Sequence, residues 1–130
     1  MTVVLDASAL LTYFFGEPGA QEVGQRLPGS VMHTVNYAEV LSKLAERGLP
    51  PEAAEQQLEQ AGLLQIIRID PGAPEDALAV ARLRPLSRSA GLSLGDRYCL
   101  ALALRLGLPA ATTDRAWGTL TLGIVIEVLR

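Results

Sequence analysis

The residues with the clearest potential for chemistry are four acids spread along the whole chain. Each of them follows an apolar run or stands close to the start of a segment with helical spacing. Carboxylates that are brought together have a repulsion energy on the order of several kcal/mol unless protons or a cation neutralise them. A hard divalent cation with oxygen ligands resolves such a cluster. The candidate metal ligands and catalytic residues are Asp6, Glu39, Asp96 and Asp114.

Five short apolar or β-branched runs predict the strands that would position these acids. Between them lie segments with the apolar spacing of amphipathic helices. Parallel strands joined by right-handed helical crossovers produce this alternation. We therefore expect an α/β fold with a central, mainly parallel, five-stranded sheet that is covered by helices on both faces. The predicted strands are 3–5, 30–34, 65–69, 109–113 and 124–128.

Glycines and prolines mark the ends of the expected helices. The first helix begins after Ser8, a predicted N-cap, and the last long helix begins at Ser93 and is apolar nearly all round. The stretch 84–91 has the least regular pattern and is expected to separate two helices. The other helices are expected near 20–27, 37–47, 51–61 and 75–83, with a short turn or helix at 115–118.

The direction of the strands predicts where the acids lie. Asp6 and Asp114 each follow directly after a strand, so they lie at the carboxyl edge of a parallel sheet, where ligands of α/β proteins bind. Glu39 is in the first turn of the helix after the second strand, at the same edge. Asp96 begins a helix that must run antiparallel to the fourth strand in order to lead into it. All four carboxylates are therefore expected at one edge of the sheet.

Each acid taken alone also fits a purely structural role. Glu39 and Asp96 each stand three residues after a capping residue, as in a capping box. Asp6 and Asp114 fit N-cap positions equally well. Helix capping does not explain why four acids gather at one edge, whereas a bound divalent cation does.

The composition limits the number of domains and the classes of protein to which the chain can belong. The chain has 130 residues, of which 49% are hydrophobic, and a mean hydropathy of +0.26, which predicts a single domain over residues 1–130. No apolar run reaches the ~18 residues that span a bilayer and no targeting segment is recognisable, so we expect a cytoplasmic protein without a membrane partner. The lone cysteine, Cys99, lies in an apolar helix and is expected to be buried.

The formal net charge of -3 argues against an obligate nucleic-acid binder. That argument weakens if several acids bind cations. All basic residues except Lys43 are arginines, whose guanidinium groups suit phosphate contacts, although solvated helix faces explain them equally well. Four of them stand close together in the sequence, namely Arg82, Arg84, Arg88 and Arg97.

The four acids stand in motifs that resemble those of the PIN-domain ribonucleases in order and spacing. The resemblance covers essentially the whole chain and is greatest to the VapC-type toxins of bacterial and archaeal toxin–antitoxin pairs. The motifs are LDASAL around Asp6, NYAEVL around Glu39, LSLGDRYCLALA around Asp96 and TTDRAW around Asp114.

This resemblance implies a metal-dependent endoribonuclease with a three-layer α/β/α, Rossmann-like PIN domain. It implies that the four acids hold one or two Mg²⁺ or Mn²⁺ ions, directly or through water, for in-line attack of water on an RNA phosphate. It also implies a homodimer and a cognate antitoxin that blocks the cleft. No protein nucleophile is then needed, which fits a lone His33 expected to be packed in a strand and the absence of a glycine-rich phosphate loop.

Neighbours of the acids are candidates for supporting roles. Ser8 and Thr113 can bond metal-bound water or orient the acids, and Asn36 is expected to cap a helix. Arg97 and Arg115 adjoin two of the acids in sequence and are candidate contacts to RNA phosphates. Ion pairs that balance the acidic cluster are the structural alternative for these two arginines.

Two other function classes stay open. An Asp that closes the first strand also occurs in phosphoryl-transfer enzymes of the haloacid dehalogenase type. Their motif has a second Asp two residues later, where this chain has Ser8. The remaining class is a non-catalytic binding module with the same fold, against which the complete set of acids argues.

Overall fold

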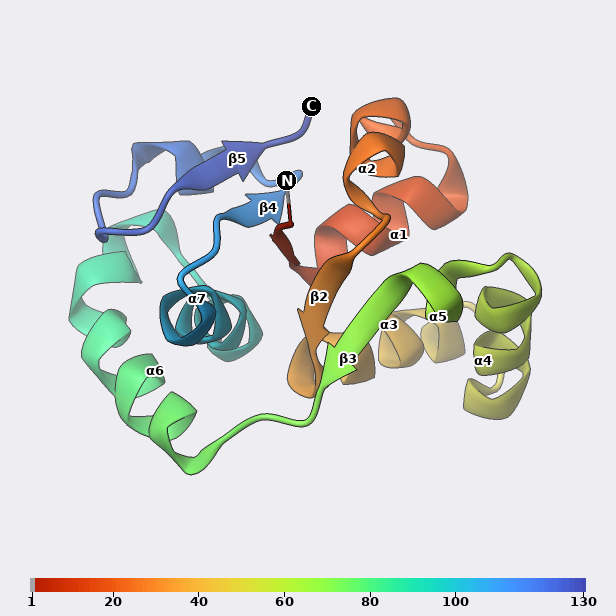
Figure 1. The fold of residues 1–130 in the computed structure, drawn as a ribbon, viewed down its shortest axis with the longest axis horizontal. Coiled ribbons are helices and arrows are strands. Elements are labelled where there is room, and N and C mark those ends of the chain that lie inside the picture. Colours follow the sequence, from red (N-terminus) through yellow and green to blue (C-terminus); the bar gives the residue numbers. More distant parts are fainter. Residues whose placement is uncertain (1) are drawn as a thin grey trace.

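A five-stranded sheet with the strand order β3-β2-β1-β4-β5 forms the centre of the computed structural model, which describes residues 2–130 (Figure 1). Every pair of neighbouring strands is parallel, so the predicted α/β fold is confirmed. The strands are β1 (Val4–Leu5), β2 (Ser30–His33), β3 (Ile67–Asp70), β4 (Ala110–Thr112) and β5 (Ile126–Val128).

Alternate side chains of the first strand segment enter two different hydrophobic cores. Val3 and Leu5 pack under the helices on one face of the sheet, and Val4 packs on the other face. All three are fully buried, which fits their uninterrupted apolar sequence. The expected three-layer α/β/α arrangement is thereby confirmed.

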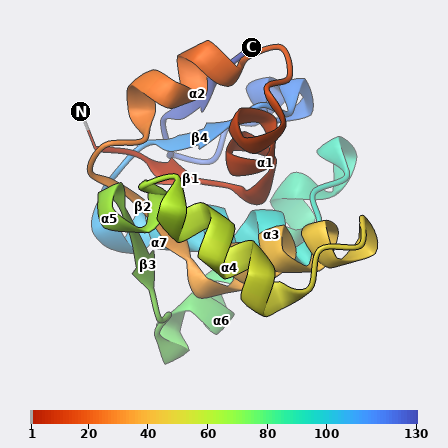
Figure 2. The ribbon, with the colours of Figure 1, turned by 90° about the vertical axis from the view of Figure 1, so that its right-hand side faces the viewer.

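Helices α1 to α5 cover one face of the sheet, and α6 and α7 cover the other (Figures 1 and 2). Cys99 on α7 is buried, as expected. None of the helices in residues 2–130 has the length and apolar character needed to cross a membrane. The α-helices of this part of the chain are α1 (Ala7–Phe15), α2 (Ala20–Arg26), α3 (Thr34–Glu46), α4 (Pro51–Gln60), α5 (Leu63–Ile66), α6 (Pro74–Ser87) and α7 (Leu94–Leu106).

Among the boundaries that differ from the sequence prediction, two have a clear local cause. The third strand begins at Ile67 rather than at residue 65, because a short helix, α5, starts after the left-handed Gly62. The stretch 84–91 was expected to be irregular, but α6 continues through Pro85 to Ser87 and a 3₁₀ turn follows at Arg88–Ala90. Burial of Leu83 and Ser87 holds this last turn of α6 in place despite the proline, and the Ser87 hydroxyl donates to the Leu83 carbonyl.

A buried ionic network joins β3, α6 and α7. Asp70 and Asp76 are 5% and 1% exposed, and the Arg105 guanidinium donates to both, at 2.7 Å and 2.8 Å. The ring of His33 also bonds Asp76, with Nε2 at 3.0 Å from Oδ2. Since His33 Nδ1 accepts from the Val35 amide, Nε2 carries the proton and donates it to the carboxylate. His33 is therefore packed and hydrogen-bonded, as the sequence analysis expected.

This network lowers the pKa values of both carboxyl groups. For Asp70 the hydrogen bond from Arg105 is the largest cause, and it outweighs the effect of burial. For Asp76 burial is the largest single cause and raises the pKa, but the hydrogen bonds from Arg105, His33 and the Ala73 amide, with the charge of Arg105, together outweigh it. Both groups therefore stabilise the fold when they are ionised.

We predict that Arg105→Ala lowers the free energy of unfolding by about 3 kcal/mol at neutral pH, because it leaves two buried carboxylates without their cation. Urea denaturation measures this loss. The ionised carboxylates stabilise the fold above their unfolded pKa of 3.8, and this contribution is lost as the pH falls through their lower folded pKa values. The difference between wild type and variant should therefore vanish in strong acid.

Arg68→Ala is the matched control, because Arg68 is the more exposed and more distant partner of Asp70, at 3.4 Å. Its effect should stay below about 1 kcal/mol. Equal losses in the two variants would contradict a special role for Arg105.

Candidate functional site

The Asp6 carboxylate is buried at the junction of β1 and α1. It is 2% exposed and serves as the N-cap of α1, accepting from the Ala9 amide at 2.8 Å. The Ser8 hydroxyl donates to it at 2.8 Å, and the Thr112 hydroxyl donates to Oδ2. Ser8 was expected to be the N-cap, but it lies within the first turn of α1 and holds the acid that caps the helix.

A chain of hydroxyl groups extends from this carboxylate. The Thr113 hydroxyl donates to Ser8 Oγ at 3.1 Å and is hydrogen-bonded to the Thr12 hydroxyl at 3.0 Å. Thr113 therefore orients Ser8 rather than an acid directly. Thr112, which the sequence analysis did not single out, is the residue that contacts Asp6. Its position follows from the pairing of Leu5 with Ala111, which brings the next residue of each strand side by side.

Burial raises the pKa of Asp6 to about 7. The hydrogen bonds from Thr112, Ala9 and Ser8 oppose this rise, and the charge of Asp96 adds to it. No cation pairs with Asp6 among the described residues, in contrast to the acids bound by Arg105. An ionised Asp6 is therefore an unfavourable buried charge in the protein as it stands.

Glu39 is half-buried on α3, where it approaches the start of α7. Asn36 links the two helices, because its amide nitrogen donates to Glu39 Oε1 and to the Gly95 carbonyl, both at 2.8 Å. Asn36 was expected to cap α3, but that cap is His33. A side chain at Gly95 would displace the Glu39 carboxylate, because a Cβ there would overlap its atoms.

Electrostatic coupling joins Glu39 to the other acids. Its pKa is raised, first by burial and then by the charge of Asp96, while Asn36 and Lys43 act to lower it. The same acids affect Cys99. Burial is the main cause that raises the pKa of its thiol, and the charges of Asp6, Asp96 and Glu39 raise it further. Three of the four predicted acids therefore surround the first turns of α7.

Asp96 and Asp114 both have the capping roles that the sequence allowed. Asp96 forms a capping box with Ser93, whose amide donates to Asp96 Oδ2 at 2.9 Å. Asp114 is exposed, and its Oδ1 accepts from the Ala116 amide at the start of the 3₁₀ helix Arg115–Thr119. The Asp114 amide donates to Thr112 Oγ1, so Thr112 connects Asp114 to Asp6.

The four acids fit a divalent cation by their chemistry, although they are not gathered into a finished ligand set. In residues 2–130, no three His, Cys, Asp or Glu side chains lie close enough together to hold a metal ion. The donors near the edge are all oxygens, which Mg²⁺ and Mn²⁺ prefer. A cation would offset the charge on Asp6 and Glu39. Asn36, which bonds Glu39, has its Oδ1 buried without a hydrogen-bond partner in residues 2–130.

The two predicted substrate arginines have different surroundings. Arg115 is exposed and follows Asp114. Arg97 is only 9% exposed, and its Nη1 donates to the Val80 carbonyl on α6. The expectation that Arg97 contacts RNA phosphates is corrected, because one step along a helix turns the side chain by about 100° and directs it into the α6–α7 interface rather than toward Asp96.

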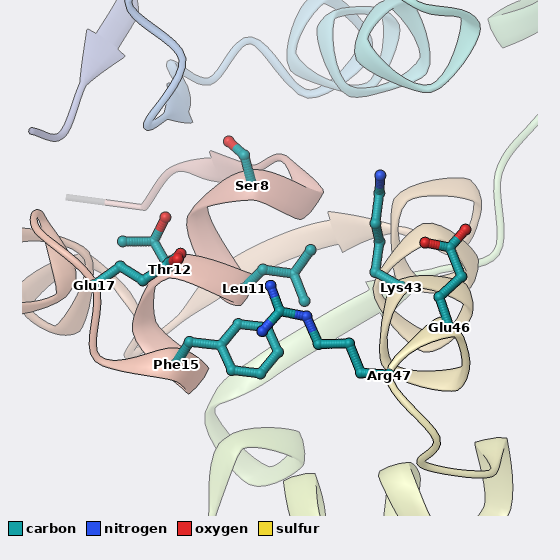
Figure 3. Close-up of a pocket in the computed structure, with 8 residues that line it drawn as sticks. All are labelled: Ser8, Leu11, Thr12, Phe15, Glu17, Lys43, Glu46 and Arg47. Atoms are coloured by element: carbon teal, nitrogen blue, oxygen red, sulfur yellow. The ribbon is translucent and has the colours of Figure 1, made fainter.

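A groove of about 380 Å³ opens between α1 and α3 (Figure 3). We call it the α1–α3 groove. Ser8, which bonds Asp6, lies at its edge, so the groove begins beside the acidic cluster. Its lining consists of Ser8, Leu11, Thr12, Phe15, Glu17, Lys43, Glu46 and Arg47.

Comparison with protein families matches residues 3–120 to the family described as PIN domain. Among solved structures, a toxin–antitoxin complex from Klebsiella pneumoniae is similar, with 22% identity, a TM-score of 0.70 and 95% coverage of both chains. FitAcB from Neisseria gonorrhoeae has 21% identity and a TM-score of 0.71, over 98% of this chain and 96% of that chain. VapBC-1 from nontypeable Haemophilus influenzae has 20% identity and a TM-score of 0.68, over 98% and 97%. A search of curated proteins finds no match.

We predict that Asp6→Asn raises the free energy of unfolding at pH 8 in EDTA. In acid below the unfolded pKa of 3.8, Asp6 is protonated in both states and the two proteins differ little. As the pH rises, the unfolded chain loses this proton first, so the wild type loses stability until the pH passes about 7. The rise of the Asp6 pKa from 3.8 to about 7 corresponds to at most about 4 kcal/mol.

Urea denaturation of wild type and variant from pH 4 to pH 8 measures this difference. Asp114→Asn is the matched control, because it removes the charge of an exposed acid and keeps a good capping residue. A pH-independent difference between wild type and Asp6→Asn would contradict the prediction.

Proposed function

Because the chain belongs to the PIN-domain family, we propose that it is a divalent-metal-dependent endoribonuclease that hydrolyses RNA phosphodiester bonds. The observation that carries this proposal is the buried Asp6, whose pKa is raised to about 7 by burial and by the charge of Asp96. The other two buried aspartates, Asp70 and Asp76, are paired with Arg105. An unpaired and partly repelled one is a site for a cation from solution.

The proposed ligands of Mg²⁺ or Mn²⁺ are the four predicted acids, with contacts made directly or through water. Such a cation supplies Lewis-acid catalysis, in which water is activated and charge on the phosphate is offset. The remaining work falls to the protein. Hydrogen bonds from Ser8 and Thr112 hold Asp6 in one orientation. Asn36 bonds Glu39, and the missing side chain at Gly95 leaves room for the Glu39 carboxylate against α7. The acids are Asp6, Glu39, Asp96 and Asp114.

Two supporting roles extend outward from the acids. Thr113 keeps the Ser8 hydroxyl directed at Asp6, so it acts on the site through Ser8. Arg115, which is exposed and follows Asp114, is the proposed contact to an RNA phosphate. The full proposed set thus contains carboxylates that bind metal, hydroxyl and amide groups that orient these carboxylates, and one arginine that contacts the substrate.

We further propose that the protein is the toxin of a toxin–antitoxin pair, acts in the cytoplasm, forms a homodimer and is blocked by a cognate antitoxin. The similar solved structures support the pairing, because they are a toxin–antitoxin complex and VapBC-1. The haloacid-dehalogenase alternative finds no such support, since position 8 holds a serine that is bonded to Asp6. The non-catalytic alternative does not account for the unpaired acids.

We predict that the purified protein cleaves at least one of a mixed set of labelled RNAs with Mg²⁺ or Mn²⁺ and none in EDTA. Asp96→Asn should reduce the rate by about 100-fold or more, because it removes a ligand charge while keeping the cap. Glu75→Gln, which neutralises an exposed acid on α6, is the matched control and should cleave like the wild type. Cleavage that persists in Asp96→Asn or in EDTA would contradict the proposal.

We predict that Gly95→Ala weakens Mn²⁺ binding by roughly 10- to 100-fold, since the new Cβ displaces the Glu39 carboxylate. The displaced atoms end a flexible side chain, so the fold itself should tolerate the change. Gly118→Ala is the control, because a Cβ there meets only Val128 at 3.7 Å. Calorimetric titration measures both affinities, and unchanged Mn²⁺ affinity in Gly95→Ala would refute the proposed role of this contact.

A further inference from the structure

Two basic residues, Lys43 and Arg47, line the α1–α3 groove. Lys43 lies one helical turn after Glu39 on α3, and Arg47 lies one turn after Lys43. This spacing places the three side chains on one face of the helix. Along this face, a proposed metal ligand is followed by two basic residues within two helical turns.

Lys43 is exposed and takes part in no ion pair within residues 2–130. In Figure 3 its ammonium group and the Ser8 hydroxyl point toward the same side of the groove. Lys43 is also close enough to Glu39 to lower the pKa of that acid. The ammonium is thus free to bind an anion that reaches the acidic cluster.

Arg47 is held in place at the other end of this row. Its guanidinium carbon lies 4.1 Å from the centre of the Phe15 ring, which together with Leu11 forms the apolar part of the groove. A cation over an aromatic face keeps its N–H groups available to a further partner. The groove therefore combines an arginine held over an aromatic ring, an exposed lysine and an apolar surface.

We propose that the α1–α3 groove binds the single-stranded RNA backbone beside the scissile phosphate, with Lys43 and Arg47 contacting neighbouring phosphates. Two residues four apart on a helix are separated by about 6 Å along its axis, similar to the spacing of phosphates along an extended strand. Leu11 and Phe15 offer an apolar surface to a base. This inference rests on the proposed nuclease function and names the path of its substrate.

Two acids also line the groove, and neutralising one of them tests whether the groove binds a polyanion. Glu17 lies just after α1, and Glu46 lies next to Lys43 on α3. A polyanion in the groove is repelled by Glu46, so neutralising this residue should strengthen RNA binding. A protein partner that lies on the apolar residues would gain no general benefit from that change.

The test uses the Asp96→Asn protein with Mg²⁺, so that RNA is not cut, and a fluorescent ten-nucleotide single-stranded RNA of mixed sequence. Fluorescence anisotropy gives its affinity between 50 and 200 mM KCl. Added Lys43→Gln should weaken binding about 10-fold at the lowest salt and reduce the slope of log K against log salt by about 0.7, the value for one lost phosphate contact. Lys43→Arg should restore the affinity, and Glu46→Gln should increase it.

Arg82→Gln, which removes an exposed cation from α6 outside the groove, is the charge-matched control and should leave affinity and slope unchanged. Lys43 is the only lysine, so acetylation of its side chain can be followed by mass spectrometry without interference from other lysines. Bound RNA should protect it.

The outcomes separate the two proposals. If the Asp96→Asn protein binds RNA but Lys43→Gln and Arg47→Gln leave affinity and salt slope unchanged, the groove is not the RNA path and this inference is overturned, while the nuclease proposal stands. The same conclusion follows if the groove variants affect only the binding of a partner protein. If the Asp96→Asn protein binds no RNA at all, this inference fails, and the cleavage assay with the wild type decides the nuclease proposal separately.

Discussion

Burial of the Asp6 carboxylate without a cation is the constraint on which the site depends. The strand that carries Asp6 is fully buried, and its pairing with β4 places the acid beside Thr112. Hydrogen bonds from Thr112, Ala9 and Ser8 fix the carboxylate but do not cancel the effect of burial, so its pKa remains near 7. Charge repulsion from Asp96 adds to this effect, so a cation at the proposed site would meet a carboxylate that is already oriented. Orientation of ligands in advance lowers the entropy loss on binding.

The protein contains a second group of buried acids that shows the opposite electrostatics. Asp70 and Asp76 are as inaccessible to solvent as Asp6, yet their pKa values are lowered because Arg105 bonds both. Those acids join β3 to α6 and α7 and stabilise the fold. The same residue type thus serves structure where the protein supplies the counter-charge, and is available for chemistry where it does not. Burial alone would not distinguish the two groups, whereas the presence of a cationic partner does.

The sequence predicted the features that depend on local pattern and strand direction. Parallel strands bring their carboxyl ends to one edge, so Asp6 and Asp114 could be placed without knowledge of tertiary contacts. Contacts that depend on register and packing could not be read in this way. Thr112 meets Asp6 only because Leu5 pairs with Ala111, and Asn36 bonds Gly95 across a separation of 59 residues. The extension of α6 through Pro85 likewise reflects packing that outweighs local propensity.

The distribution of charge on α3 bears on how an acidic protein would bind the proposed polyanionic substrate. The net charge of -3 is a sum over the whole surface, whereas an RNA strand meets only the charges near its path. Along one face of α3, Glu39 faces the other acids and Lys43 and Arg47 face the groove. A cation bound at the acids would remove the main repulsion at the point where the phosphate must react, and the two basic residues would act on the adjoining backbone. Metal and substrate binding would then be coupled through electrostatics. The bound cation would offset the acids that repel the phosphate, and the phosphates would offset the two basic residues that repel the cation.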